Sequence, residues 1–397
     1  MRPTGPIDAR VMIISDFPSQ LEMGMQTFLS SGREGQLLDK LLQRAGFHRT
    51  SIYLTGACHI SPPKDKKNQP DIEQWVNPRK TCPGVGWERH FDHWLAPEIL
   101  SGWAQLQKEI NLVKPDLIIT LGSLPLLLLT GCKGANKWRG SRLSPASLPG
   151  ALLPTIHPSV CLKSEELIPI LELDLKRAKR IFTGEQKPRS YNFNSKPCFI
   201  EVLNFLDALL HAANTSPEQI PVTGDLETRR GHIACFGIGI SETEALCIPI
   251  LQASGASPFY WTEDEEFQIV HRLQPLFRHP NILWVGQNYL YDCQYFWRFW
   301  GFLPLNVFDT MIGQHSLHSN MRKGLDFISS MYAHDYIYWK DESKDWDSDL
   351  GEEQLWEYNC KDCCYTWEDY IEIVRAQEKM GNASHHQFQQ DLFFPVL

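Results

Sequence analysis

Pro221-Val-Thr-Gly-Asp-Leu-Glu-Thr228 is the stretch of sequence from which the fold can be worked out. An apolar run is followed by two carboxylates, Asp225 and Glu227, with one residue between them. On a β-strand, side chains two positions apart point to the same face, so both carboxylates can reach one cation. Two adjacent carboxylates repel each other unless positive charge lies between them. The stretch therefore predicts a strand that carries part of a metal site.

Two further carboxylates follow downstream of this strand. Asp292 ends the run Gly286-Gln-Asn-Tyr-Leu-Tyr-Asp292, just after an apolar strand predicted at 282–285. Asp362 ends Tyr358-Asn-Cys-Lys-Asp362, inside a helical pattern that places Tyr358 and Asp362 on one face. Hard cations such as Mg²⁺ or Mn²⁺ prefer oxygen ligands, and two of them about 4 Å apart can activate water and stabilise a leaving oxygen. The four carboxylates therefore favour a two-metal phosphodiester hydrolase.

The order of these motifs resembles the DEDDy branch of 3′–5′ exonucleases. Four intervening stretches resemble the proofreading domain of phage-type family A DNA polymerases: Phe308-Asp-Thr-Met311, Lys323-Gly-Leu-Asp-Phe327, Tyr338-Trp-Lys-Asp-Glu342 and Trp356-Glu-Tyr-Asn359. The resemblance covers about residues 199–380, and its specificity comes from order, spacing and flanks, since each motif alone is common. It implies a DnaQ-like, ribonuclease-H-like domain with a mixed sheet that binds two divalent metal ions, Mg²⁺ or Mn²⁺.

The same resemblance implies roles for single residues. The four carboxylates bind the metal ions, and Tyr358 orients the attacking water. Asn288 helps to place the scissile end of the substrate, which is a single-stranded or frayed 3′ DNA end. The product is a nucleoside monophosphate. Trimming of RNA, as in ribonuclease D, stays open, because no residue that contacts a 2′-hydroxyl can be identified.

The remaining pattern of the second half agrees with this fold. Apolar periodicity predicts helices at about 199–212 and 263–277, and strands around Asp225 and at 233–240, 245–251 and 282–285. Asp309 starts a predicted helix and is expected to cap it. Cys360 and Cys363 have zinc-like spacing, but no second pair accompanies them, so buried thiols are the favoured interpretation.

Residues 1–182 alternate between strand and helix patterns. Buried strands are predicted at 11–15, 51–58, 116–122 and 152–156, with helices at 35–47, 97–113 and 124–129. The segment 64–80 has little periodicity and is predicted to be a surface loop. The alternation indicates a three-layer α/β/α domain around a mainly parallel sheet. In such sheets, ligands bind beyond the carboxyl ends of the strands.

Those strand ends carry Asp16-Phe-Pro-Ser19, Thr55-Gly-Ala57 and His157-Pro-Ser159. Together with Phe28 and Gly35-Gln-Leu-Leu38, they resemble the uracil-DNA glycosylase superfamily, closest to its family 4. The resemblance implies that Asp16 positions water, that Phe28 stacks on a flipped base and that His157 stabilises the departing base anion.

Two departures separate the chain from family 4. Gly56 stands where that family carries the Asn that reads uracil, and the four-cysteine iron–sulfur pattern is absent, so no iron–sulfur cluster is expected. Uracil excision is therefore expected to be impaired while DNA binding is retained. Gly56→Asn is expected to recover weak activity if the surrounding backbone still matches. Taken singly, Asp16 can also be a strand-end turn carboxylate, and His157 a satisfied core histidine.

The composition is that of a globular protein with two domains. The 397 residues are 43% hydrophobic and 21% charged, and the longest apolar run, 117–130, is too short for a membrane span. Scattered cysteines and the lack of a signal pattern predict a cytoplasmic protein without a membrane partner. The resemblance to phage-type polymerases implies that this is a phage-infected bacterial cell. The net charge of −9 is uneven, because residues 1–190 hold 25 Lys and Arg against 18 Asp and Glu. DNA phosphates are therefore expected to contact mainly the first half.

The expected organisation is a uracil-DNA glycosylase-like domain at 1–182, a linker at 183–198 and a 3′–5′ exonuclease domain at 199–385. Residues 386–397 resemble the start of a polymerase thumb, so a polymerase domain is expected in the same full-length chain. The main expectation is a proofreading-type 3′–5′ DNA exonuclease. Two alternatives stay open: a base-excision glycosylase with an end-trimming exonuclease, and a non-catalytic DNA-binding platform for a polymerase.

Overall fold

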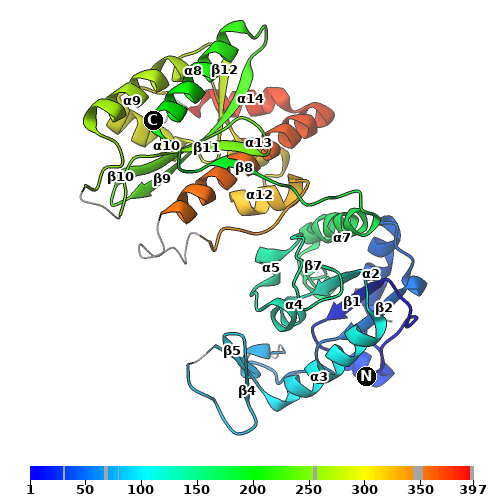
Figure 1. Ribbon diagram of the computed structural model, residues 1–397. Coiled ribbons are helices and arrows are strands. Elements are labelled where there is room, and N and C mark those ends of the chain that lie inside the picture. Colours follow the sequence, from blue (N-terminus) through cyan, green and yellow to red (C-terminus); the bar gives the residue numbers. More distant parts are fainter. Residues whose placement is uncertain (30–31, 67–69, 79, 254–256, 343–351, 394–397) are drawn as a thin grey trace. The chain divides into compact units, whose positions relative to one another are not determined.

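The computed structural model describes residues 1–29, 32–66, 70–78, 80–253, 257–342 and 352–393. The chain divides into two compact units (Figure 1). The N-terminal unit comprises Met1–Pro188 and Asp335–Tyr338, and the C-terminal unit comprises Arg189–His334 and Trp339–Leu397. Within the described ranges, no helix is both long and apolar enough to cross a membrane.

A four-stranded parallel sheet forms the centre of the N-terminal unit, in the order β2-β1-β6-β7. Its strands are β1 (Val11–Ser15), β2 (Ile52–Gly56), β6 (Leu117–Leu121) and β7 (Ala151–Thr155). All four are largely apolar and buried, as expected for a parallel sheet that helices cover on both faces. The register pairs Ser15 with Gly56 on one side and with Leu121 on the other. The residues that follow these strands therefore meet at one edge of the sheet.

Helices on both faces of this sheet confirm the predicted three-layer arrangement. Helices α2 (Gly32–Arg44) and α7 (Ile168–Thr183) pack with Ile13 on one face. Helices α3 (Pro97–Val113) and α4 (Ser123–Thr130) pack with Met12 on the other face, because successive side chains of a strand alternate. The short connecting elements are α1 (Gln20–Met25), α5 (Ala135–Trp138), α6 (Pro158–Cys161), η1 (Arg49–Ser51), η2 (Ile72–Gln74) and η3 (Glu165–Leu167).

A small antiparallel sheet belongs to the same unit, in the order β3-β5-β4. It consists of β3 (Val76–Asn77), β4 (Glu88–His90) and β5 (His93–Leu95). β3 falls inside the predicted surface loop at 64–80, because a two-residue strand gives no periodic signal of its own. Residues 67–69 and 79 of that predicted loop lie outside the described residues.

The segment Asp335–Tyr338 is part of the N-terminal unit, although it lies late in the chain. The Arg142 guanidinium donates to both carboxylate oxygens of Asp335, at Nε–Oδ1 and Nη2–Oδ2 distances of 2.9 and 3.4 Å. The Arg142 N–H donates to the Tyr336 carbonyl oxygen at 2.9 Å. The Tyr338 N–H donates to Ser141 Oγ at 3.0 Å. Since Tyr336 is also fully buried, the segment is a structural part of this unit.

A six-stranded mixed sheet forms the centre of the C-terminal unit, in the order β13-β12-β9-β10-β11-β8. Its strands are β8 (Asn192–Asn194), β9 (Ile220–Arg229), β10 (His232–Gly239), β11 (Glu244–Pro249), β12 (Ile282–Gly286) and β13 (Val307–Asp309). β9, β10 and β11 are antiparallel neighbours, whereas β12 runs parallel to β9. The edge strand β8 lies in the stretch where the sequence predicted a linker.

Helices cover both faces of the mixed sheet. Helices α8 (Phe199–Thr215) and α9 (Glu263–Phe277) pack on one face, and the long helix α13 (Glu353–Met380) packs on the other. The remaining elements are α10 (Leu290–Tyr295), the π-helical turn η4 (Phe296–Trp300), α11 (Thr310–Leu317), α12 (Leu325–Tyr332) and α14 (Ala383–Asp391). Figure 1 shows these helices around the sheet.

A glycine permits the close approach of α13 to the sheet. A Cβ at Gly237 would lie 2.4 Å from Asn359 Oδ1 and 2.8 Å from Cys363 Sγ. Gly237 pairs with Asp225 in the register of β10 and β9. The missing side chain therefore lets the helix that carries Asp362 lie against the strand that carries Asp225.

Cys360 and Cys363 lie in this contact and are buried together with Cys235 and Cys247. In the part of the chain that the structure describes, no cysteine belongs to a group of side chains that could hold a metal ion. The burial of both thiols agrees with the buried-thiol interpretation of this spacing.

Helix α14 has apolar partners within the C-terminal unit. The His386 ring lies 4.5 Å from the Phe308 ring, measured between centroids, and Phe393 is buried in the main core. Both residues come from the stretch that resembles the start of a polymerase thumb. Residues 394–397 of that stretch lie outside the described residues.

Candidate active site

Strand β9 and helix α13 bring three carboxylates together. One oxygen from each of Asp225, Glu227 and Asp362 lies within 4.8 Å of the others. Leu226, between the two acids of β9, belongs to the hydrophobic core on the opposite face, as alternation along a strand requires. The three residues that the motif spacing predicted to share a site therefore do lie together.

Asp292 reaches the same strand from α10. Its Oδ1 accepts a hydrogen bond from the Leu226 N–H at 2.7 Å, between the two acids of β9. Burial raises the pKa of Asp292 well above its ordinary value, and the charges of Asp309 and Glu227 add to the increase. The grouping within 4.8 Å comprises the other three carboxylates, so Asp292 stands beside the cluster.

The cluster concentrates negative charge in a poorly hydrated position. Burial raises the pKa of Asp225 well above its ordinary value, and repulsion from the neighbouring carboxylates, Asp362 first, raises it further. Burial and then Asp362 raise the pKa of Glu227 to about 7. Carboxyl groups that resist ionisation in this way have too little positive charge around them. Because the donors are all oxygens, the site fits a hard divalent cation such as Mg²⁺ or Mn²⁺.

Lys340 supplies one positive charge at the cluster. Its Nζ donates to Asp362 Oδ2 at 2.5 Å and to the Tyr358 hydroxyl at 2.8 Å. The indole of Trp339 donates from Nε1 to Asp362 Oδ1 at 2.5 Å. Burial lowers the pKa of Lys340, but attraction to Asp362, Tyr358 and Asp225 outweighs burial and raises the net value. Consecutive residues of one segment thus hold both oxygens of Asp362.

Sequence reasoning assigns no role to Lys340. Its segment, Tyr338-Trp-Lys-Asp-Glu342, contributes to the family resemblance, but it has no periodicity from which a contact could be derived. Its partner Asp362 lies 22 residues further along the chain. The usable signal was a lysine next to a tryptophan, upstream of the Tyr-x-x-x-Asp motif.

Tyr358 lies one helical turn before Asp362 on α13, as its spacing predicted. Its hydroxyl oxygen accepts the hydrogen bond from Lys340, so the hydroxyl hydrogen can be donated to another group. Burial, followed by the charge of Asp362, raises the pKa of Tyr358 far above its ordinary value. The hydroxyl is therefore protonated at neutral pH and serves as a donor rather than as a base.

Asn288 lies in the turn between β12 and α10, with a φ of 55°, a left-handed conformation in which Asn is enriched. Its N–H donates to Asp309 Oδ1 at 3.1 Å, and the residue is exposed. Asp309 also accepts from the Met311 N–H and caps α11, which confirms the predicted cap. The turn therefore presents the Asn288 amide at the surface, where a substrate strand can reach it.

The raised carboxyl pKa values predict a pH-dependent stability in the absence of metal ions. Between about pH 4.5 and 7, the folded protein retains a proton on Glu227 that the unfolded chain has released. The free energy of unfolding should therefore fall as pH rises through this window, by up to about 1.4 kcal/mol per pH unit for each such proton. The raised pKa of Asp225 acts in the same direction. Thermal unfolding in EDTA across this window measures the slope.

The double variant Asp225→Asn/Glu227→Gln is the matched control, because it removes both titrating groups and keeps their shape. The difference between the two proteins also cancels the opposite contribution of His157, whose pKa burial lowers to about 4. Equal slopes in the two proteins would contradict the assignment. Saturating Mg²⁺ should abolish the slope of the wild type in this window, because metal-bound carboxylates are deprotonated, as they are in the unfolded chain.

The residues predicted for a glycosylase-like pocket lie at the carboxyl edge of the N-terminal sheet. Asp16 follows β1, Gly56 ends β2 and His157 follows β7. Ser15 Oγ lies 3.1 Å from His157 Nε2, which connects the ends of β1 and β7. Phe28 packs directly against Gly56. The sheet thus brings all four predicted residues to one edge.

The Phe28 ring fills the space beside Gly56. Phe28 is fully buried, and a Cβ at Gly56 would lie 2.2 Å from its Cε1. An asparagine at this position would require the Phe28 ring to shift, and the expectation that Gly56→Asn recovers weak uracil excision stays a prediction. The Phe28 ring therefore lies directly beside Gly56 and is enclosed by the protein.

Asp16 and His157 both have structural partners. Asp16 Oδ1 accepts from the Leu124 N–H at the start of α4, at 2.8 Å, and burial raises the pKa of Asp16 to about 7. His157 Nδ1 lies 2.8 Å from Ser159 Oγ, so both ring nitrogens have hydroxyl neighbours. Burial lowers the pKa of His157 to about 4, so the imidazole is neutral at pH 7. Both side chains therefore have hydrogen-bond partners within the unit, and their roles in a glycosylase-like pocket stay predictions.

Comparisons with known proteins agree with an organisation in two domains. Residues 2–176 match the family model of the uracil DNA glycosylase superfamily, and residues 199–375 match the family model of a 3′–5′ exonuclease. The chain thus carries a domain of the uracil DNA glycosylase superfamily followed by a 3′–5′ exonuclease domain.

Several solved nuclease structures are similar to this chain. Escherichia coli RNase D, described as an exoribonuclease involved in structured RNA processing, is 15% identical with a TM-score of 0.39, over 52% of this chain and 50% of that one. The catalytic core of RRP6 from Trypanosoma brucei is 15% identical with a TM-score of 0.40, over 51% and 52%. Brucella melitensis NrnC with bound Mg²⁺ is 18% identical with a TM-score of 0.35, over 45% and 86%. The chain therefore spans about half the length of the first two proteins.

Proposed function

We propose that this chain is a proofreading-type 3′–5′ DNA exonuclease of the DEDDy kind and part of a phage-type family A DNA polymerase. The observation that carries the proposal is the convergence of Asp225, Glu227 and Asp362 next to the hydroxyl of Tyr358. With Asp292, these carboxylates would hold two divalent metal ions. Such ions, when bound, activate a water molecule and stabilise the leaving oxygen, which releases nucleoside monophosphates.

The chain's own residues would orient the reacting groups. The protonated Tyr358 hydroxyl donates a hydrogen bond to the attacking water and so fixes its position. Lys340 holds both Tyr358 and Asp362, so one ammonium group sets the orientation of both. The exposed amide of Asn288 places the scissile end. Positioning of this kind removes much of the entropic barrier of a bimolecular step.

Digestion of a 3′-labelled single strand by wild type and Tyr358→Phe tests this proposal. The wild type should release mononucleotides with Mg²⁺ and none in EDTA. Tyr358→Phe should lower turnover by about 10²-fold, the usual range for a positioned proton-transfer or water-orienting group, with Mn²⁺ affinity unchanged. Tyr370→Phe is the matched control, because Tyr370 lies on α13 like Tyr358 but packs its ring against Phe308 of β13. Loss of Mn²⁺ binding in Tyr358→Phe would contradict the role of Tyr358 in orienting water. Faster digestion of a matching RNA strand by the wild type would contradict the assignment of DNA as the substrate.

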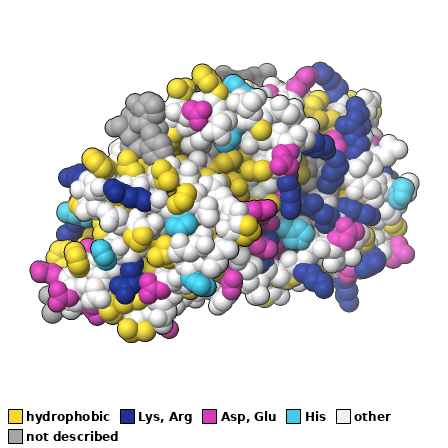
Figure 2. All heavy atoms as spheres, turned by 90° about the horizontal axis from the view of Figure 1, so that it is seen from above, with side chains coloured by type: hydrophobic (Ala, Val, Ile, Leu, Met, Phe, Trp, Pro, Cys, Tyr) yellow, Lys and Arg dark blue, Asp and Glu magenta, His cyan; other side chains and the backbone are white. Residues whose placement is uncertain are grey.

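The N-terminal unit is proposed to bind DNA and to be impaired in uracil excision. Phe28 against Gly56 supports the impairment, since a base whose polar edge finds no partner loses about 1–3 kcal/mol per missing hydrogen bond. The excess of Lys and Arg in residues 1–190 supports contacts with phosphates. Figure 2 shows Lys and Arg side chains gathered on part of one face of the molecule.

Uracil-containing DNA should yield no abasic sites above background with the wild type, as measured by alkaline strand cleavage. Gly56→Asn should lower the free energy of unfolding by about 1–3 kcal/mol, because the new side chain overlaps the buried Phe28 ring. Gly24→Asn is the matched control, because Gly24 is exposed, has no left-handed φ, and a Cβ there meets no atom within 4 Å. Robust abasic-site formation by the wild type that Asp16→Ala eliminates would show a working glycosylase.

A further inference from the structure

We propose that a cavity between α4 and the small sheet of the N-terminal unit binds a nucleotide whose base carries an amino group. The cavity has a volume of about 470 Å³, within the range of roughly 300–1,000 Å³ that is typical of small-molecule sites. None of Asp16, Phe28, Gly56 and His157 lines it. These glycosylase-like residues do not form the cavity, although Leu124 of its lining donates its N–H to Asp16. Occupancy of the cavity does not depend on exonuclease chemistry.

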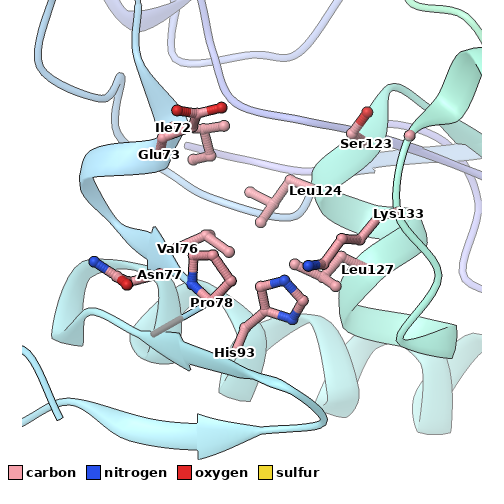
Figure 3. A pocket seen from close by; sticks show the side chains of 11 residues that line it. Ile72, Glu73, Val76, Asn77, Pro78, His93, Ser123, Leu124, Leu127 and Lys133 are labelled. Atoms are coloured by element: carbon pink, nitrogen blue, oxygen red, sulfur yellow. The ribbon is translucent and has the colours of Figure 1, made fainter. Parts of the chain in front are cut away.

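The walls of the cavity suit a flat ring with apolar faces. Val76 comes from β3 and Pro78 directly follows that strand, whereas Leu124 and Leu127 come from α4. Figure 3 shows these side chains turned toward the same space from the two sides. A nucleobase can lie between such walls with its polar atoms directed along the plane of the ring, toward the polar residues of the rim.

The unpaired imidazole of His93 is the strongest indication that the cavity binds a ligand. The residue is 3% exposed, and its Nδ1 is buried without a hydrogen-bond partner among the described residues. Figure 3 shows the ring extending into the cavity from β5. Burial lowers the pKa of His93, and nearby Lys133 lowers it further, so the imidazole is neutral at pH 7. Because buried polar atoms are nearly always paired, a rotation of the ring that turns Nδ1 toward the cavity would let a ligand atom complete the site.

Opposite charges at the two ends of the cavity define how a nucleotide fits. The ammonium of Lys133 points into the cavity, and the Glu73 carboxylate lies at the far side (Figure 3). Neither side chain forms an ion pair among the residues that the structure describes. A phosphate therefore pairs with Lys133, and an exocyclic amino group donates to Glu73, as carboxylates do to the amino group of cytosine. Thymine lacks this donor.

The test is equilibrium binding to the full chain with Asp225→Asn/Glu227→Gln, in EDTA, so that the exonuclease site neither binds metal ions nor cuts. The probes are the four deoxynucleoside 5′-monophosphates, a 3′-blocked single strand and inorganic phosphate. We expect dAMP, dCMP and dGMP to bind more tightly than dTMP. Lys133→Gln should weaken binding by about tenfold or more, the usual loss for a hydrogen bond to a charged group. Leu127→Trp should abolish binding by filling the cavity.

Matched controls separate the cavity from general surface effects. Lys108→Gln removes an exposed lysine of α3, and Leu112→Trp adds a tryptophan at an exposed position of the same helix. Both should bind like the parent protein. Glu73→Gln should reduce the preference over dTMP, and thermal unfolding checks that each variant folds.

The two sources of a nucleotide are distinguished by the probes. Binding of mononucleotides but not of the strand identifies a free nucleotide as the ligand, and binding of both with the same variant pattern identifies a nucleotide within a strand. Either result supports the site. Equal binding by the Lys133→Gln and Lys108→Gln proteins, or inorganic phosphate competing as well as dCMP, overturns it.

Discussion

Asp225→Asn/Glu227→Gln should lower the release of mononucleotides from single-stranded DNA by about 10³-fold or more. Metal ions supply several kcal/mol of transition-state stabilisation, and each 1.4 kcal/mol or so corresponds to a factor of ten in rate. The two amides keep the shape of the carboxylates but cannot balance the charge of a divalent cation. Without metal ions, the variant should unfold at the same temperature as the wild type or a higher one, because two mutually repelling buried carboxylates are gone.

Glu263→Gln/Asp264→Asn removes the same charge from exposed positions at the start of α9 and is the matched control. It should digest DNA at the wild-type rate. Calorimetric titration with Mn²⁺ should show heat of binding in this control and none in the Asp225→Asn/Glu227→Gln protein. A double variant that still releases mononucleotides at the wild-type rate would place the site elsewhere.

Lys340→Met should produce the largest change in stability. Removing one partner of a buried ion pair costs about 3 kcal/mol or more, and the lower end applies because the Lys340 side chain is 25% exposed while that of Asp362 is 4% exposed. For a unit of this size, the loss corresponds to a fall of about 6–12 °C in the midpoint of thermal unfolding. Saturating Mn²⁺ should restore most of it, because a bound cation replaces the missing charge.

Lys361→Met is the matched control, because Lys361 also forms an ion pair, with Glu342. The side chains of this pair are more exposed, at 26% for Lys361 and 39% for Glu342. Exposed pairs contribute about 0–1 kcal/mol, so its midpoint should move little. The activity of Lys340→Met should fall through turnover rather than through the Michaelis constant, because Lys340 orients Tyr358 and Asp362. Equal midpoints for the two variants in EDTA would show that Lys340 does not neutralise the cluster.

Elements with strong local patterns were predicted closely from the sequence. β1 was expected at 11–15, and helices were expected at 97–113 and 263–277, which are the bounds of β1, α3 and α9. In these segments, apolar spacing and end signals such as the Pro that starts α3 agree with each other. The position of Asp225 and Glu227 on one face could be predicted equally well, because side chains two residues apart share a face in any strand.

The features that the sequence could not give depend on contacts between distant segments. Lys340 reaches Asp362 from a stretch without periodicity, and the edge strand β8 exists only because β11 offers it a partner. The ring of Phe28 against Gly56 is a matter of side-chain placement that no motif encodes. Resemblance to a glycosylase places these residues at one edge but does not say that the space between them is filled.

The polypeptide passes between the two units three times, after Pro188, after His334 and after Tyr338. A protease that cuts only between residues 183 and 198 therefore does not release two complete bodies. Its N-terminal piece lacks Asp335, which pairs with Arg142, and the fully buried Tyr336. Its C-terminal piece carries them as an unsupported loop that leads directly into Trp339 and Lys340, the residues that hold Asp362. Exchange of nuclease modules between relatives thus requires that a matching partner for Arg142 travels with the module.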